Sequence, residues 1–240
     1  MKALLLAAGY GTRLRPITDT VPKCMVPLGH KPLLAYWLEA LSSTDPTNLA
    51  TRAANFEKIV VNTHYLPQVV ESFIDASPWR NKVSLLHEKE LLGTAGTLRA
   101  SRTILGESAF LMAHADNASR FSLSDFLAKF NEKPAGCIGT MMTFKTSSPR
   151  ECGIVEIDTN GILVNYFEKV DNPPSDLANA AVFIFEPEIH EILKERASAK
   201  DFCAEVVPYL VGKLNTFHNN VYHRDVGTPI AYHQALQDFA

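Results

Sequence analysis

The first loop of the chain combines glycine with positive charge in a pattern suited to binding polyphosphate. Arg13, Arg15 and Lys23 bring three cations to this region, and the sequence from residue 6 reads LAAGYGTRLRP. Glycines let backbone N–H groups approach an anion closely, and guanidinium and ammonium groups form strong hydrogen bonds to phosphate oxygens. We therefore expect a polyphosphate site where the first strand ends.

This loop differs from two common phosphate-binding loops. It lacks the G-x-x-x-x-G-K-[ST] spacing of a Walker P-loop. It also fails the dinucleotide fingerprint, because Leu14 occupies the third glycine position and no acidic residue is placed about 20 residues on to hold a ribose. The pattern thus argues against a nicotinamide-dependent dehydrogenase.

A carboxylate follows a later strand. The apolar run from Ala109 to His114 predicts a strand, and Asp116 comes just after it. Open α/β sheets bind their ligands at the carboxyl ends of strands, so Asp116 occupies a position where it could meet one. A single aspartate in a loop is more often a cap or turn residue, and its interpretation depends on the rest of the pattern.

The elements that would position these side chains alternate between strand and helix in the first half. Strands are expected over 2–8, 59–63, 83–87 and 109–114, and helices over 32–41, 67–74, 94–105 and 122–131. Ser122 and Asp125 form a weak capping box for the last of these helices. The alternation predicts a mostly parallel sheet with helices on both faces.

The pattern of apolar residues changes after Gly136. Three strand-like runs cover 137–144, 152–157 and 162–168, and the turn Asp158-Thr159-Asn160-Gly161 predicts a hairpin between the last two. A strand over 181–185 and helices starting near Pro187, Asp201 and Pro229 complete the pattern. The second half thus mixes antiparallel strands into the sheet. Because no linker divides the chain, we expect one domain, 1–240, with halves 1–135 and 136–240.

Composition excludes several classes of partner. The 240 residues are 46% hydrophobic and carry 23 basic against 26 acidic side chains, for a net charge of −3. This balance offers no basic surface for nucleic acid, and no apolar run approaches the ~20 residues of a membrane span. No export signal is recognised, and the four cysteines form no C-x-x-C pair. We expect a cytoplasmic protein.

The motifs together resemble the sugar-1-phosphate nucleotidyltransferase family. Its opening pattern L-A-A-G-x-G-T-R-L-x-P, followed by P-K-x-M-x-P, matches at every fixed position, as does D-x-G-T-P at Asp225. The resemblance implies an enzyme that joins a nucleoside triphosphate to a sugar 1-phosphate and releases pyrophosphate, with Mg²⁺ as cofactor. It implies a Rossmann-like mixed, mostly parallel sheet flanked by helices, with a small antiparallel sugar-binding annex. No hexapeptide repeats are present, so we expect no β-helix domain.

The resemblance also assigns residues to roles. It implies catalytic roles for Arg13, Lys23, Asp116 and Asp225, the two aspartates being the metal ligands. The first half would bind the nucleotide through Leu6, Ala8, Gly9, Gly11, Thr12, Arg13, Glu88, Gly93 and Thr94. The second half would bind the sugar phosphate through Gly153, Glu168, Lys169 and Asn179.

A charge argument explains why this chemistry needs such residues. A triphosphate and a sugar phosphate bring several negative charges together, and two unit charges about 4 Å apart interact by ~4 kcal/mol at an effective dielectric near 20. Mg²⁺ prefers one or two carboxylates together with phosphate oxygens and water. Arg13 would hold the departing phosphates, Lys23 the α-phosphate and Lys169 the sugar phosphate, so no nucleophilic side chain is needed.

Several points stay open at this level. The element Leu92-Gly93-Thr94-Ala95-Gly96 with Glu88 favours guanylyl transfer to mannose 1-phosphate or a related sugar, with thymidylyl or uridylyl transfer as alternatives. A catalytically silent sugar-nucleotide-binding regulatory subunit is another alternative. Ala115, Val170 and His223 depart from the family pattern; His114 and His223 are interpreted as packing residues. The segment 42–55 is interpreted as a surface insertion used in self-association, which allows a homo-oligomer.

Overall fold

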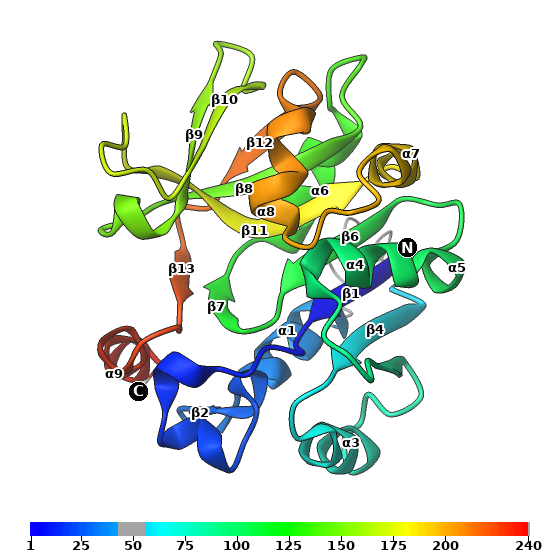
Figure 1. Ribbon diagram of the computed structural model, residues 1–240, viewed down its shortest axis with the longest axis vertical. Helices are drawn as coiled ribbons and strands as arrows, with labels where there is room; N and C mark the ends of the chain where they lie inside the picture. The colour runs from blue at the N-terminus through cyan, green and yellow to red at the C-terminus, as the bar shows by residue number, and fades with distance from the viewer. Residues whose placement is uncertain (43–55, 240) are drawn as a thin grey trace. The chain divides into compact units, whose positions relative to one another are not determined.

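A computed structural model describes residues 1–42 and 56–239 (Figure 1). Apart from Ser42, the expected insertion at 42–55 lies outside the described residues. The chain forms two compact units, each made of more than one segment. Unit 1 comprises Met1–Leu91, Ala113–Arg120 and Tyr222–Ala240, and unit 2 comprises Leu92–Met112 and Phe121–Val221. The halves 1–135 and 136–240 were predicted to bind the nucleotide and the sugar phosphate, and this assignment stays a prediction.

Unit 1 contains a parallel sheet that begins with the first strand. Strand β1 (Lys2–Leu6) pairs with β4 (Lys58–Thr63), which pairs with β5 (Val83–His87), both in parallel register. Most residues of β1 and β4 are buried without alternation, as expected for strands covered on both faces. Helices α1 (Leu33–Ser42) and α3 (Pro67–Asp75) belong to the same unit (Figure 1).

Unit 1 also contains two short antiparallel ladders. Strand β2 (Pro27–Leu28) pairs with β3 (Lys31–Pro32), and β7 (Asn117–Arg120) pairs with β13 (Tyr222–Asp225). Helix α9 (Pro229–Asp238) follows β13 directly and begins with the Thr228 side chain accepting a hydrogen bond from Ala231 N–H. The sequence pattern predicted none of these short strands.

An apolar cluster in unit 1 fixes the segments around the predicted polyphosphate loop. Leu14 and Val226 are both buried in it, and they neighbour Arg13 and Asp225 in the sequence. The other buried members come from the loop region, α1, β7 and α9: Val26, Leu28, Leu33, Ala118, Tyr232, Ala235 and Phe239. Leu14 thus serves packing at the position where a dinucleotide-binding loop has glycine.

Unit 2 holds five complete strands. Strand β8 (Gly139–Lys145) lies between β11 (Leu177–Phe185), which is antiparallel to it, and β12 (Leu214–His218), which is parallel. The predicted hairpin is confirmed: β9 (Gly153–Ile157) and β10 (Leu163–Glu168) pair antiparallel around the Asp158–Gly161 turn. Strand β11 is longer than the predicted run over 181–185, because Leu177 to Asn179 pair with β8 as well.

Five helices belong to unit 2. The helix predicted over 94–105 is two helices, α4 (Gly93–Ala100) and α5 (Arg102–Leu105). They meet at Ser101, whose hydroxyl donates to the carbonyl of Thr97, a bond that competes with regular helix geometry. The cap at Ser122 is confirmed for α6. The remaining bounds are α6 (Leu123–Asn131), α7 (Ile189–Glu195) and α8 (Phe202–Glu205).

The predicted fold class is confirmed. The strands form a mixed, mostly parallel central sheet flanked by helices, with small antiparallel sheets in addition. Strand β6 (Phe110–His114) carries the chain from unit 2 back to unit 1 just before Asp116. Within residues 1–42 and 56–239, none of the helices is both long enough and apolar enough to cross a membrane.

Candidate active site

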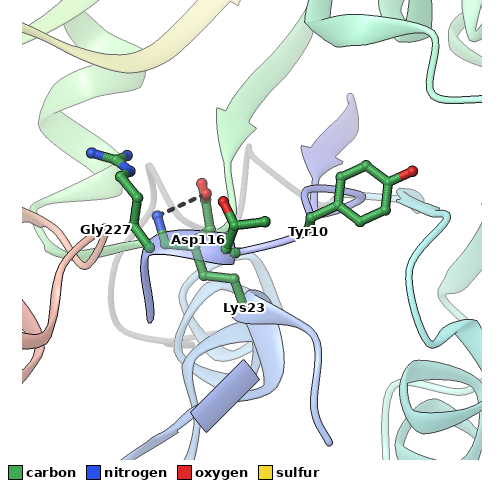
Figure 2. Close-up of a pocket in the computed structure, with 7 residues that line it drawn as sticks. Tyr10, Lys23, Asp116 and Gly227 are labelled. Atoms are coloured by element: carbon green, nitrogen blue, oxygen red, sulfur yellow. Dashed lines mark hydrogen bonds and ion pairs between the residues drawn. The ribbon is translucent and has the colours of Figure 1, made fainter. Parts of the chain in front are cut away.

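A hollow of about 280 Å³ opens in unit 1 beside the first loop (Figure 2). It brings together residues from the loop, from the end of β6 and from the segment after β13. Its lining consists of Tyr10, Gly11, Thr12, Arg13, Lys23, Asp116 and Gly227. Five of these seven were predicted to bind the nucleotide or to act in catalysis. The polyphosphate loop and the carboxylate that follows β6 therefore share one site.

Gly11 lets the loop turn into the hollow. Its φ of 63° lies in the left-handed region, which favours glycine, and a β-carbon there would come within 3.0 Å of the side chains of Thr18 and Lys23. The Gly11 carbonyl accepts hydrogen bonds from the Leu14 N–H at 2.9 Å and the Thr18 hydroxyl at 2.8 Å. A tight 3₁₀ turn over 12–14 follows and places Arg13 at the hollow.

Lys23 is the centre of the site. Its ammonium donates hydrogen bonds to Asp116 Oδ2 and to Asp225 Oδ1, both at 2.9 Å, and the first of these bonds is drawn in Figure 2. The Lys23 side chain is only 8% exposed, whereas that of Asp225 is 52% exposed. The two carboxylates predicted to share a metal ion thus converge on one point from distant parts of the sequence.

Mutual electrostatics keep this cluster charged. Burial on its own would lower the pKa of Lys23, but the charges of Asp116 and Asp225 and the hydrogen bonds to them outweigh burial and raise it. Burial would likewise raise the pKa of Asp116, but the Lys23 charge, with a smaller contribution from His114, lowers it instead. Lys23 and Asp116 therefore stabilise the charged forms of each other.

Arg13 and Gly227 lie on the Asp225 side of the cluster. The guanidinium Nη2 of Arg13 is 3.9 Å from Asp225 Oδ2, and the Arg13 side chain is 65% exposed. A β-carbon on Gly227 would come within 2.9 Å of both groups. Gly227 therefore leaves the space in which the guanidinium and the carboxylate approach each other.

The β7–β13 ladder brings Asp225 to Asp116. Asp225 is the cross-strand partner of Asn117, the residue directly after Asp116. The indole N–H of Trp37 on α1 donates to the Asn117 carbonyl at 2.8 Å, which anchors this end of β7. The geometry of the carboxylate pair thus follows from backbone pairing and from one buried hydrogen bond.

The other predicted nucleotide residues of unit 1 lie around the end of β1. Leu6 and Ala8 are buried, Gly9 is exposed, and the Leu6 carbonyl accepts a hydrogen bond from the Ala115 N–H at 3.0 Å. Glu88 is only 4% exposed, and its Oε1 accepts a hydrogen bond from Asn62 Nδ2 at 2.8 Å. None of these four residues lines the hollow itself.

Gly93 and Thr94 begin α4 in unit 2. The φ of Gly93 is 74°, and a β-carbon there would lie 2.5 Å from the Lys200 carbonyl oxygen. The Thr94 hydroxyl oxygen accepts a hydrogen bond from the Phe202 N–H at 2.7 Å. Both residues therefore have a packing role within unit 2, and their predicted contact with a nucleobase stays a prediction.

The predicted sugar-phosphate residues gather in unit 2. Glu168 pairs with Gly153 across the β9–β10 ladder, and the Lys169 ammonium is 3.2 Å from Glu168 Oε1. Asn179 Nδ2 lies 3.4 Å from the hydroxyl of Tyr166, which donates to Glu168 Oε2 at 2.5 Å. A β-carbon on Gly153 would overlap that hydroxyl. The structure thus brings all four predicted residues into one cluster.

Sequence reasoning missed three residues of these clusters. Tyr10 stands at the unspecified position of the loop pattern, and Gly227 within D-x-G-T-P was quoted but given no role. Tyr166 forms the centre of the unit 2 cluster, and burial is the main cause that raises its pKa. Its position two residues before Glu168 on a strand, and therefore on the same face, is a signal that could have identified it.

The surroundings of His223 differ from those expected of a catalytic base. Burial, with a further contribution from His114, lowers the pKa of His223 to about 4 against the opposing charge of Asp225. His223 Nδ1 lies 3.3 Å from the Ser119 hydroxyl across the β7–β13 ladder. A neutral, half-buried imidazole in this position is consistent with a packing role.

Comparisons with known proteins show the family of this chain. The family model described as nucleotidyl transferase matches residues 2–240. A glucose-1-phosphate thymidylyltransferase of Streptomyces griseus is 36% identical over 192 residues, which cover 80% of this chain and 51% of that protein. The mannose-1-phosphate guanylyltransferase catalytic subunit beta of Danio rerio is 32% identical over 236 residues, which cover 95% of this chain and 62% of that protein. The chain therefore spans between half and two thirds of these relatives.

A solved structure supports the fold. The UDP-glucose pyrophosphorylase structure with UDP-glucose superimposes with a TM-score of 0.77 at 21% identity, covering 99% of this chain and 97% of that one. At this identity the likeness concerns the fold, which is the Rossmann-like type expected from the sequence. The family match extends over nearly the whole chain, including both clusters. The chain belongs to the nucleotidyl transferase family.

Proposed function

We propose that this chain is an enzyme that joins a nucleoside triphosphate to a sugar 1-phosphate and releases pyrophosphate. The observation that carries the proposal is the convergence of Asp116 and Asp225 on the Lys23 ammonium, at 2.9 Å from each, beside the Arg13 guanidinium. Carboxylates for a divalent cation and cations for phosphates are the groups that such a reaction requires. Membership of the nucleotidyl transferase family supports the same reaction.

The carboxylate pair fits Mg²⁺ as the cofactor. Both are hard oxygen donors, and they point at one position from two separate strand ends. Within residues 1–42 and 56–239, no cluster of three or more His, Cys, Asp or Glu side chains could form a closed cage around a metal ion. Two carboxylates suit Mg²⁺, which completes its octahedron with water and substrate phosphates. When bound, Mg²⁺ would neutralise phosphate charge and orient the phosphate oxygens.

The side chains of unit 1 would act by position and charge. An oxygen of the sugar phosphate attacks the α-phosphorus, a new P–O bond forms, and the bond to the β-phosphate oxygen breaks as pyrophosphate leaves with the electron pair. Arg13 would hold the β- and γ-phosphates, and Lys23 would neutralise charge that develops on the α-phosphate. These roles lower the barrier through orientation and electrostatic stabilisation, without a covalent intermediate on the protein.

The unit 2 cluster would bind the sugar 1-phosphate. Lys169 is 61% exposed in its side chain and is available to hold the attacking phosphate, while Glu168 next to it would orient the ammonium. Asn179 and the backbone at Gly153 would contact the sugar. Charge from Glu168 and a hydrogen bond to it outweigh burial and raise the pKa of Lys169, so this group carries its charge at neutral pH.

For the substrates, we favour GTP with mannose 1-phosphate or a related sugar. The Leu92–Gly96 element with Glu88 is most similar to guanylyltransferases, and the Danio rerio relative named as one aligns with 95% of this chain. Thymidylyl or uridylyl transfer is the alternative, because the Streptomyces griseus relative is named for thymidylyl transfer.

One panel of assays tests the proposal. The purified chain is mixed with Mg²⁺, each of the four nucleoside triphosphates and a series of sugar 1-phosphates, and pyrophosphate release is followed. We expect turnover with one favoured pair, and loss of turnover in Asp116→Asn and Asp225→Asn. Asp75→Asn, which changes an exposed aspartate 3.8 Å from Arg80, is the matched control and should remain active.

The same panel separates the alternatives. Turnover with dTTP or UTP in place of GTP would replace the favoured base while keeping the reaction. Tight nucleotide binding with no pyrophosphate release from any pair would contradict the enzyme and support the silent regulatory subunit.

A further inference from the structure

Glu88 is connected to the first loop through a buried chain of hydrogen bonds. Its Oε1 accepts from Asn62 Nδ2 at 2.8 Å, and Asn62 Oδ1 accepts from the backbone N–H of Ala7 at 2.6 Å. A carboxylate accepts hydrogen bonds, so the Asn62 amide has one orientation that satisfies both partners. Asn62 and Glu88 are 3% and 4% exposed. The hydrogen bonds that hold Ala7 are therefore shielded from solvent.

A second chain leaves the same residue from its backbone. The Glu88 carbonyl oxygen accepts a hydrogen bond from His64 Nδ1 at 2.8 Å. Because a carbonyl only accepts, Nδ1 carries the proton, and in the neutral ring Nε2 is then an acceptor. The Tyr10 hydroxyl lies 2.9 Å from Nε2 and donates to it when the ring is neutral. The imidazole also contacts the Tyr10 ring edge-on, with 5.4 Å between centroids.

The two series of hydrogen bonds that start at Glu88 hold opposite ends of one short turn. Ala7 and Tyr10 bound the turn that precedes Gly11, and Gly9 between them is exposed and has no atom within 4 Å of where a β-carbon would be. Packing at Gly9 therefore does not determine the path of the turn. Tyr10 is itself 44% exposed and lines the hollow with Arg13 and Lys23. Figure 2 shows Tyr10 and Lys23 among the side chains around it.

We propose that Asn62, His64 and Glu88 are positioning residues that fix the Ala7–Tyr10 turn and thereby hold Tyr10 as a wall of the nucleotide site. This inference rests on the proposed function. It assigns Glu88 a role that works through Asn62 and His64, and it makes Tyr10 a determinant of nucleotide affinity. Loss of the His64–Tyr10 bond raises KM for the nucleotide, while kcat changes little, since Lys23 and the carboxylates are untouched.

A double-mutant cycle on nucleotide affinity tests the His64–Tyr10 connection. Tyr10→Phe removes the hydroxyl, and His64→Phe keeps an aromatic ring but removes both hydrogen bonds. Tyr10→Phe should weaken binding of the preferred nucleoside triphosphate by about fivefold, the effect of one net hydrogen bond, and His64→Phe should weaken it at least as much. The double variant should bind no more weakly than His64→Phe, because both changes break the same connection. Effects that multiply, or no effect at all, would overturn the inference.

A charge exchange tests the Asn62–Glu88 connection. Asn62→Asp keeps the acceptor for Ala7 N–H but turns an oxygen toward the Glu88 carboxylate, so nucleotide affinity should fall. Adding Glu88→Gln supplies an amide donor in the reverse direction, and Asn62→Asp/Glu88→Gln should recover affinity. A double variant as weak as Asn62→Asp, with unchanged thermal stability, would contradict the positioning role.

A matched control removes a tyrosine hydroxyl elsewhere. Tyr36→Phe deletes a hydroxyl that donates to the Leu28 carbonyl at 2.6 Å, outside the hollow, and should leave nucleotide affinity unchanged. If the wild-type chain binds none of the four nucleoside triphosphates, the proposed function fails. If it binds one and the cycle is additive, the inference alone fails.

Discussion

Asp225 pairs with Asn117 across the β7–β13 ladder, and this pairing sets Asp225 beside Asp116. Both carboxylates then reach the same Lys23 ammonium at 2.9 Å. The ladder is short, but it is braced by the Trp37 hydrogen bond to the Asn117 carbonyl and by the apolar cluster that contains Ala118 and Val226. A backbone register therefore determines the spacing of the proposed metal ligands.

The first prediction concerns the carboxylates. Asp116→Asn and Asp225→Asn each remove one charged ligand while keeping the side-chain volume, and each should lower turnover at least a hundredfold, or ~3 kcal/mol in the barrier. Pyrophosphate release with saturating substrates measures this. Retention of more than about a tenth of the wild-type rate in either variant would rule out that residue as an essential ligand.

The second prediction concerns competition for the carboxylates. Because the Lys23 ammonium lies between Asp116 and Asp225, a cation that binds this pair without nucleotide must displace it. Lys23→Met should therefore bind Mn²⁺ more tightly than the wild type in the absence of nucleotide, while its turnover falls about a hundredfold. Electron paramagnetic resonance of free Mn²⁺ reports the affinity.

Arg13→Met separates displacement from a general loss of positive charge. Arg13 is 3.9 Å from Asp225 and does not lie between the carboxylates, so its removal should affect Mn²⁺ affinity less than Lys23→Met does. If both variants raise Mn²⁺ affinity equally, the cause is the loss of a nearby positive charge, and the Lys23 ammonium need not be displaced.

The third prediction concerns Gly227. The β-carbon of Gly227→Ala would lie 2.9 Å from both Arg13 Nη2 and Asp225 Oδ2, so the ends of these two side chains must shift from their positions. Turnover should fall while the melting temperature changes little, because the strain acts on the exposed side chains of Arg13 and Asp225. Wild-type turnover in this variant would show that the spacing of the two groups is not needed.

The fourth prediction concerns stability and pH in unit 2. Burial, assisted by the nearby Arg102 charge, lowers the pKa of His190 from its usual 6.5, although Glu107 and Glu191 oppose this. Its ring stacks on Phe110 at 5.5 Å. The unfolded chain therefore takes up a proton at His190 before the folded chain does. Stability from this residue is fully present above pH 6.5 and is lost as pH falls toward the lower, folded-state pKa.

The measurement is urea unfolding at a series of pH values, with His190→Leu as the comparison. The wild type should lose more stability than this variant as pH falls below 6.5. Equal slopes for the two proteins would show that His190 does not titrate differently in the folded and unfolded states.

Much of the fold and of the site was accessible from the sequence. The alternation of apolar runs predicted the main strands and helices, and the positions of Gly11, Arg13, Lys23 and Asp116 at one hollow follow from strand ends that share an edge of the sheet. Strands β7 and β13 were missed because their few residues are largely polar and show no clear alternation. Short ladders of this kind depend on a partner strand far away in the sequence.

Other parts of the site depend on contacts that no local pattern encodes. Tyr10 occupies a position that the loop motif leaves open. Its partner His64 and the Glu88 carbonyl to which His64 is bonded follow two other strands. The identities of the base and the sugar also could not be predicted from a local pattern. A pocket discriminates between substrates through a few hydrogen bonds, and their directions depend on how the folded chain places the groups.

The pairing of Arg120 with Tyr222 has a consequence for how such proteins can diversify. The chain leaves unit 1 after Arg120 and returns to it at Tyr222, and these two residues pair with each other on one ladder. Residues 121–221 therefore form an excursion that begins and ends at the same place in unit 1. This excursion carries Gly153, Glu168, Lys169 and Asn179. Asp225 lies on the ladder, and Asp116 lies directly before it. Because residues 92–112 pack with this excursion in unit 2, an exchange between homologues would have to carry both segments; under the proposed function it would change acceptor preference while the proposed cation ligands stay in unit 1.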